Sequence, residues 1–415
     1  MVRRASPRLP CGASAVTVLA MLGLCQLPFA QGLEDGRIGV LFVGDTARAP
    51  PFKMMVSDPL YSVGFVYASI RGWGLTSYDS AAVQRAIRMN MPRTYGDLMK
   101  RYDVIVLSEA NLQALGTSYI EMLSRGAEEG GRGLLMSGGW ESFGGAGYPA
   151  WGQTSIGRIL PTEDVPGTWV QEGRLVIDNK DNEFIRSLPW NPSDYFMNNF
   201  HHNVVTLRQG AELLAHIDST SLAAWKDHPA MVTWDLDSGA MVFAYTGDLT
   251  ELSWWGTPWI YAYDFQSNLA IYIGRRPVPQ DINLVHLVRT MMFQIAVRKS
   301  LLLTLLDFCE TFGANTRKVV SGMDGVDAAI ASAKAKYLEL RFDEVLDIYR
   351  QAEKALVGLE ADAMVLKDRA LLWVYAIEWL AVTATALVSS FLLWSIMVRR
   401  RLYREVRLTR FSGTM

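Results

Sequence analysis

The stretch that decides the fold is Gly133-Leu134-Leu135-Met136-Ser137-Gly138-Gly139-Trp140-Glu141-Ser142-Phe143. An apolar run ends in two glycines, and a polar, aromatic loop follows. Buried parallel strands end in this way at the carboxyl edge of an α/β sheet, where such folds place their sites. The stretch therefore predicts a central strand with a candidate site in the turn after it.

Two earlier runs have the same character. Arg37–Gly44 precedes Asp45, and Asp103–Ser108 precedes Glu109, so each apolar segment ends at an acidic residue. Helices are expected between these strands and before the Gly133 strand; their ranges are Val63–Ile70, Ala81–Ile87 and Ser118–Glu129. Alternation of strand and helix favours an α/β fold with a doubly wound sheet.

Shorter strands are expected after Pro161. Three of them are predicted at Arg174–Ile177, Val204–Leu207 and Glu212–Ile217. Two further runs, Met231–Trp234 and Ala240–Tyr245, flank a turn-rich link that is typical of a hairpin. A helix over about Trp259–Ile273 should close this part of the chain, which we take as an α/β domain over residues 32–280.

The segment 281–368 is predicted to form a helical stalk. A long apolar helix is expected from Asp281 to Phe312, and apolar residues then recur at helical spacing between Val326 and Leu359. The second part is expected to be a helical hairpin. Residues 326–359 are also the expected place of contact with a second copy of the chain or with a membrane protein.

A membrane-spanning helix is predicted over residues 369–398. Leu371–Val398 contains 28 residues and a single charged side chain, Glu378. About 20 apolar residues suffice to cross the hydrocarbon core. Arg399, Arg400 and Arg401 follow at once, so the positive-inside rule places the basic tail 399–415 in the cytoplasm and the body outside.

Residues 1–31 resemble an export signal or an N-terminal anchor. Basic residues precede an apolar run, and Pro28-Phe29-Ala30-Gln31 follows, in which Ala30 suits a cleavage site and Pro28 does not. Of the 3 cysteines, Cys11 and Cys25 lie in this segment and only Cys309 lies beyond it. A body without an internal disulfide, attached by one span, is consistent with a prokaryotic cell surface.

Charge is unevenly distributed. The total formal charge is −2, the first ten residues contribute +3 and the tail from Arg399 contributes +5, which leaves −10 for the rest. An acidic body argues against nucleic-acid binding. Glycines after the Gly133 strand lack the spacing of dinucleotide or phosphate loops, so no cofactor is expected.

The body resembles the membrane-associated, amidotransferase-like branch of the class I glutamine-amidotransferase superfamily. The resemblance rests on Tyr102–Ser108, Gly130–Phe143, Ile159–Pro161 and Gly239–Asp248, which stand in the same order. It implies a flavodoxin-like α/β fold that covers well more than half of the chain. Active members of the superfamily carry a cysteine in the turn that follows Met136 here, and this chain has none in that turn.

Glutamine hydrolysis needs a thiolate, a histidine and backbone donors for the oxyanion. Cys309 lies in an apolar helix and is expected to be core. Ser137 could replace the thiol only with a base within reach, and His201, in a loop, is the candidate. His216 and His286 are expected to be structural. We therefore expect no glutaminase activity, that is, a pseudoenzyme.

Seven residues at the predicted strand ends are candidates for ligand binding: Asp45, Glu109, Gly138, Gly139, Trp140, Glu141 and Asp248. The acidic members could hold a cation, although solvated acids that cap turns explain them more simply, and no metal site is predicted. The expected function is an extracytoplasmic ligand- or partner-binding module. The alternatives are a hydrolase that uses Ser137 or a bound cation, and a structural subunit of a membrane assembly.

Overall fold

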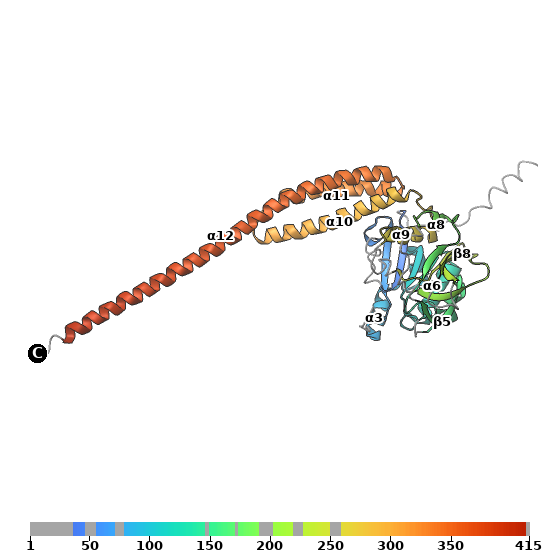
Figure 1. The fold of residues 1–415 in the computed structure, drawn as a ribbon, viewed down its shortest axis with the longest axis horizontal. Helices are drawn as coiled ribbons and strands as arrows, with labels where there is room; N and C mark the ends of the chain where they lie inside the picture. Colours follow the sequence, from blue (N-terminus) through green and yellow to red (C-terminus); the bar gives the residue numbers. More distant parts are fainter. Residues whose placement is uncertain are drawn as a thin grey trace, which may run out of the picture. The chain divides into compact units, whose positions relative to one another are not determined.

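In a computed structural model of the chain, residues 36–45, 55–70, 79–145, 149–170, 173–190, 202–218, 227–249 and 259–411 are described. Residues 1–31 and His201, for which a signal and a catalytic role were predicted, lie outside them. The contacts divide the chain into two compact units. One contains the described residues up to Arg289 together with Tyr337–Phe342, and the other contains Thr290–Lys336 and the chain from Asp343 (Figure 1).

The first unit is built on a mixed eight-stranded sheet. Its parallel part has the order β2-β1-β3-β4-β10, formed by Tyr61–Tyr67, Ile38–Gly44, Val104–Ser108, Gly133–Ser137 and Met241–Tyr245. The register aligns the last residues of these strands in one row: Tyr67, Gly44, Ser108, Ser137 and Tyr245. The carboxyl ends of all five strands therefore meet at one edge.

The sheet continues in antiparallel fashion through β9 (Asp227–Asp235), β8 (Glu212–Asp218) and β6 (Arg174–Ile177). The β9–β10 pair confirms the predicted hairpin. A separate two-stranded sheet pairs β5 (Thr162–Val170) with β7 (His202–Leu207). The predicted α/β class and the three short strands after Pro161 are thus confirmed.

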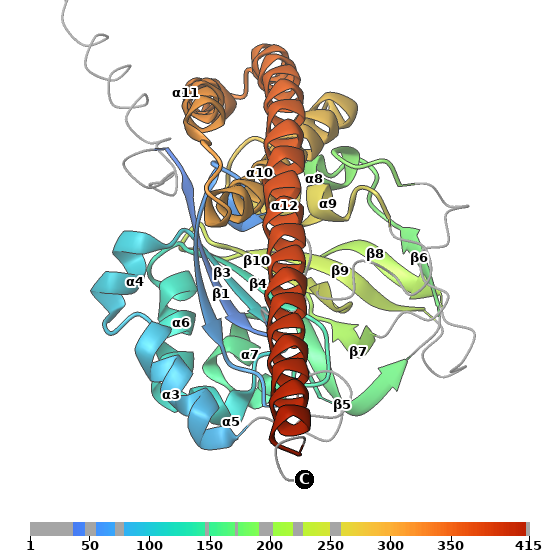
Figure 2. The same ribbon diagram turned by 90° about the vertical axis from the view of Figure 1, so that its left-hand side faces the viewer.

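Helices cover both faces of the sheet (Figure 2). One face carries α3 (Ser80–Asn90), α4 (Tyr95–Arg101), α5 (Leu112–Leu115), α6 (Thr117–Glu128), η1 (Trp151–Gln153) and α7 (Ser155–Ile159), which share a buried core with the strands. The other face carries α8 (Glu183–Arg186) and α9 (Ala262–Ile273). There Phe184 packs edge-on against Phe243 and Phe265, with ring centroids 5.7 and 5.6 Å apart.

The prediction of a helix over Val63–Ile70 was wrong, because this segment contains most of β2. Its β-branched and aromatic residues favour a strand. The strand lies at the edge of the sheet and is only partly buried, so it lacks the continuous apolar run of its neighbours. Gly64 is required by the packing, since a Cβ there would lie 2.2 Å from the hydroxyl oxygen of Tyr102.

Three helices follow the sheet: α10 (Ile282–Thr311), α11 (Arg317–Leu338) and α12 (Phe342–Phe411). The predicted hairpin is confirmed, but its second arm continues without a break into the predicted span, so α12 is a single helix of 70 residues. In the second unit an ion pair of 2.7 Å joins Arg298 of α10 to Glu360 of α12. Apolar residues of the hairpin, among them Val326, Val345 and Leu356, are buried within the chain.

Among the described residues, one helix is long and apolar enough to cross a membrane, and it is α12. Its most apolar window has a mean hydropathy of 1.9, and no part of that window is buried. Between Leu372 and Tyr403, most of the large apolar side chains are exposed, as expected of a surface that faces lipid.

Candidate functional site

The acidic residues predicted at the strand ends do lie at one edge of the sheet. Asp45 follows β1, Glu109 follows β3, Glu141 lies in the turn after β4, and Asp248 follows β10. All four are at least nine-tenths buried, with exposed fractions from 2 to 6%. Four buried carboxyl groups at the carboxyl edge of parallel strands form the most unusual polar feature of this edge, because charged groups are costly to bury.

Glu109 occupies the centre of this edge. Its Oε1 accepts a hydrogen bond from the backbone N–H of Trp140 at 2.7 Å, and its Oε2 accepts one from the N–H of Glu141 at 2.9 Å. Its own φ is +54°, which is rare for a residue with a side chain. Such backbone strain persists where the surrounding structure enforces it, and it is common at functional sites.

Burial, followed by the negative charge of Asp248, raises the pKa of Glu109 well above its usual value. Hydrogen bonds from the N–H groups of Glu141 and Trp140 act in the opposite direction. The carboxyl group of Glu109 therefore holds its proton to a higher pH than an exposed glutamate does.

Glu141 connects three strand ends. Its carboxylate accepts hydrogen bonds from the Ser69 hydroxyl at 2.7 Å, from the Ile70 N–H at 3.1 Å and from the Asn111 side-chain amide at 2.6 Å. Ser69 follows β2 and Asn111 follows β3, so this one side chain joins the loops of β2, β3 and β4. Its role in the described residues is to fix the shape of the edge.

Gly138 and Gly139 are required by close backbone approaches. A Cβ on Gly138 would lie 1.7 Å from the carbonyl oxygen of Thr246. A Cβ on Gly139, whose φ is +141°, would lie 2.2 Å from Oε1 of Glu109. The two glycines thus permit the turn, as the sequence suggested, and they also admit the Glu109 carboxylate.

Asn203 is a site residue that the sequence reasoning missed. Its Oδ1 accepts a hydrogen bond from the Gly139 N–H at 2.7 Å, and its Nδ2 donates to the carbonyl oxygens of Gly139 at 3.1 Å and Ser142 at 3.3 Å. It comes from β7, which belongs to the second sheet. The polar run that ends in His201-His202-Asn203 is the available signal, but nothing in that run singles out the asparagine.

Ser137, the candidate nucleophile, is fully buried. Its hydroxyl donates to the Gly247 carbonyl at 3.0 Å and accepts from the Leu249 N–H at 3.0 Å. Both hydrogen bonds join the end of β4 to the loop after β10. An attacking hydroxyl would have to break these contacts, so the observed role of Ser137 is structural.

The side chains of the described histidines make other contacts. The rings of His202 and His228 stack with centroids 4.8 Å apart, and both are buried. His216 pairs with Asp178 at 2.8 Å, and His286 pairs with Asp264 at 2.6 Å. Cys309 is buried in α10, and burial raises the pKa of its thiol, which opposes formation of a nucleophilic thiolate.

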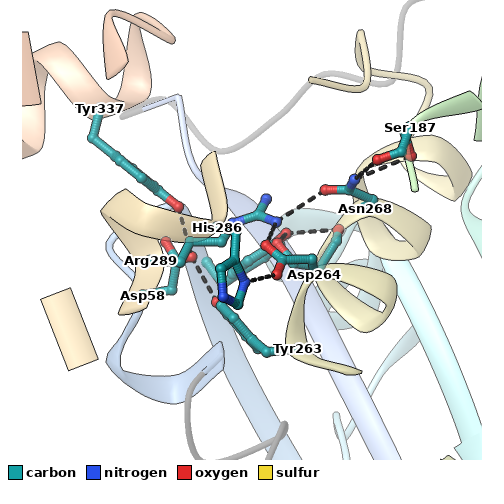
Figure 3. A network of polar contacts seen from close by, with 10 residues as sticks. Asp58, Ser187, Tyr263, Asp264, Asn268, His286, Arg289 and Tyr337 are labelled. Atoms are coloured by element: carbon teal, nitrogen blue, oxygen red, sulfur yellow. Dashed lines mark hydrogen bonds and ion pairs between the residues drawn. The ribbon is translucent and has the colours of Figure 1, made fainter. Parts of the chain in front are cut away.

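A second buried polar cluster lies at the amino end of β2 (Figure 3). Asp58 accepts hydrogen bonds at its Oδ2 from the hydroxyl of Tyr263 at 2.6 Å and from that of Tyr337 at 2.8 Å. Tyr263 lies on α9, whereas Tyr337 lies near the end of α11. The cluster therefore fixes the α11–α12 turn, residues 337–342, within the first unit.

Arg289, on α10, forms the other half of this cluster. Its Nη1 donates to Oδ1 of Asp264 at 2.7 Å and to Oδ1 of Asn268 at 3.0 Å, and its side chain is 1% exposed. His286 contacts the second oxygen of the same Asp264. Burial raises the pKa of Asp58, and the positive charge of Arg289 opposes that effect.

Within the described residues, no three His, Cys, Asp or Glu side chains are arranged to hold a metal ion. Neither the family models nor the curated proteins contain a match to this chain. The fold and the edge thus define a class and no more: a mixed α/β protein with a mostly parallel sheet and one candidate membrane helix.

Proposed function

We propose that the chain is a membrane-anchored, amidotransferase-like module that binds a ligand at the carboxyl edge of its sheet and does not hydrolyse it. The parallel order β2-β1-β3-β4-β10 supports the flavodoxin-like part of this proposal, because that family of folds uses the order 2-1-3-4-5. The candidate span in α12 supports the proposed attachment to a membrane. The positive-inside rule supports a body outside the cytoplasm.

One observation carries the non-hydrolytic part of the proposal. Acyl transfer needs backbone N–H groups that are aimed at the developing oxyanion. In the turn after β4, two such groups, those of Trp140 and Glu141, are already bonded to the carboxylate of Glu109. Both N–H groups are therefore occupied and are not free to stabilise an oxyanion, and neither Ser137 nor Cys309 is arranged as a nucleophile.

The charge of the edge indicates the class of ligand. Carboxylates accept hydrogen bonds and attract cations, and Asp45 and Asp248 bring such groups to one edge. A ligand that donates hydrogen bonds, such as a primary amide or an ammonium group, is complementary to this edge. A carboxylate or phosphate ligand is not.

The test uses the full-length chain in detergent and L-glutamine as the probe. We expect glutamine to raise the thermal unfolding temperature, and we expect Asp248→Asn to abolish the shift. Asp237→Asn is the matched control, because Asp237 is exposed in the β9–β10 turn. An unchanged shift in Asp248→Asn would contradict the assigned site, and turnover that is lost in Ser137→Ala would favour a hydrolase instead.

A structural subunit is the second candidate, and one observation favours it. Val297, Leu301 and Phe308 are exposed on α10 at spacings of four and seven, which is the spacing of a helix–helix seam. The predicted contact region 326–359 has buried much of its apolar face within the chain. A dimer in detergent that Leu301→Glu converts to a monomer would support this candidate.

A further inference from the structure

The three-helix unit contains a cavity beside the start of the candidate span. It has a volume of about 560 Å³ and lies between the α10–α11 turn and α12. Volumes of this size accommodate small ligands. Phe312 and Arg317 line it from the turn, and Leu366, Arg369 and Trp373 line it from α12.

The polar part of the lining is cationic. Arg317, Lys318 and Arg369 contribute three positive charges, and no acidic side chain lines the cavity. Lys318 is paired with Asp362 at 2.8 Å. Within the described part of the chain, no carboxylate pairs with Arg317 or Arg369, so both guanidinium groups are available to an anion. Guanidinium groups bind phosphate through two parallel hydrogen bonds.

The apolar part of the lining continues into the span. Trp373 is 66% exposed and Phe312 is 41% exposed. Arg369 stands two residues before Leu371, where the 28-residue apolar run begins. Aromatic side chains at this position are typical of the interface between lipid headgroups and acyl chains. In a membrane span that begins at Leu371, the cavity would open near the level of the lipid phosphates.

We propose that this cavity binds the headgroup of one anionic phospholipid from the leaflet that surrounds the first turns of the span. Arg317 and Arg369 contact the phosphate, and Phe312, Leu366 and Trp373 pack against the glycerol and the upper acyl chains. The surplus of positive charge favours an anionic lipid over a zwitterionic one. Such a lipid would hold the α10–α11 turn against the membrane surface.

The test measures retained lipid by native mass spectrometry of the full-length chain in detergent. Phosphatidylglycerol and phosphatidylcholine with identical acyl chains are added in parallel. We expect one phosphatidylglycerol to bind per chain, about tenfold more tightly than phosphatidylcholine. The double variant Arg317→Gln/Arg369→Gln should lose about tenfold in affinity for phosphatidylglycerol. Excess inorganic phosphate should not displace the lipid, because it lacks the apolar contacts.

Two variants serve as controls. Lys334→Gln/Lys354→Gln removes the same charge from exposed positions of α11 and α12 that do not line the cavity, and it should bind lipid like the wild type. Arg317→Lys/Arg369→Lys keeps the charge and should retain most of the binding. Equal affinity for the two lipids, or equal binding by the arginine-to-glutamine variant and the wild type, would overturn the proposal. Displacement by inorganic phosphate would reassign the site to a free anion.

Discussion

The carboxylate of Glu109 lies so close to the backbone of Gly139 that a Cβ atom on Gly139 would stand 2.2 Å from Oε1. The two residues come from different strand ends, after β3 and β4, and each requires the other. Glycine leaves the space, and the carboxylate fills it and bonds the next two N–H groups of the turn. The shape of the edge depends on this contact.

Gly139→Ala should destabilise the first unit by about 3 kcal/mol, through overpacking against Glu109 together with a positive φ. Chemical unfolding in detergent, followed by tryptophan fluorescence, measures the change. Gly210→Ala is the matched control, because Gly210 also has a positive φ but a Cβ atom there would meet nothing within 4 Å. The control should lose only about 1 kcal/mol. Equal losses in the two variants would show that the Glu109 contact is unimportant.

Glu109→Gln should weaken the dependence of stability on pH. The folded-state pKa of Glu109 is raised above its usual value of 4.5, so between these two values the folded chain keeps a proton that the unfolded chain has released. The free energy of unfolding then falls as pH rises, by at most about 1.4 kcal/mol per pH unit for one group. Glutamine does not titrate, so the variant should lose this part of the slope.

Thermal unfolding at a series of pH values from the usual pKa of a glutamate upward measures the slope. Glu121→Gln is the control, since Glu121 is exposed on α6, and it should keep the wild-type slope. An identical slope in Glu109→Gln and the wild type would mean that Glu109 is ionised in the same way in the folded and unfolded chains.

Tyr337→Phe should cost about 1–2 kcal/mol, because it removes one of the hydrogen bonds to the buried carboxylate of Asp58. Hydrogen exchange should report the loss locally, as faster exchange in residues 337–342. Tyr119→Phe is the control, because Tyr119 packs on the core and its hydroxyl has no hydrogen bond within the described residues. If Tyr337→Phe is no less stable than the control, Asp58 does not need this donor.

Arg289→Met should destabilise the first unit by about 3–5 kcal/mol, because it leaves the carboxylate of Asp264 buried without its main countercharge. Adding Asp264→Asn to this variant should recover part of the loss. A double-mutant cycle with Asp264→Asn alone gives the coupling between the two side chains. Independent, additive losses would contradict the ion pair.

Much of the fold follows from local pattern. β1, β3 and β4 are continuous apolar runs that end in polar turns, and such runs are recognisable without tertiary information. The same pattern predicts Asp45, Glu109, Glu141 and Asp248 at one edge, because parallel strands bring their carboxyl ends together. The segment Leu371–Val398 is recognisable by length and hydropathy alone.

The parts that were missed depend on contacts distant in sequence. β2 is an edge strand with an irregular burial pattern, so the spacing of its apolar residues did not distinguish it from a helix. Asn203 reaches Gly139 across 64 positions of sequence, and Tyr337 reaches Asp58 across 279. No local spacing encodes such pairs. The direction of the Glu109 carboxylate, toward the N–H groups of Trp140 and Glu141, was equally unpredictable. It depends on the positive φ of Glu109.

Ammonia release from L-glutamine by the purified full-length chain tests the central claim most directly. With two N–H groups of the turn bonded to Glu109 and no cysteine in the sequence of that turn, we expect no release above that of the Ser137→Ala variant. Release at an enzymatic rate by the wild-type chain, lost in Ser137→Ala or in Glu109→Gln, would contradict the claim that this edge binds without catalysing hydrolysis.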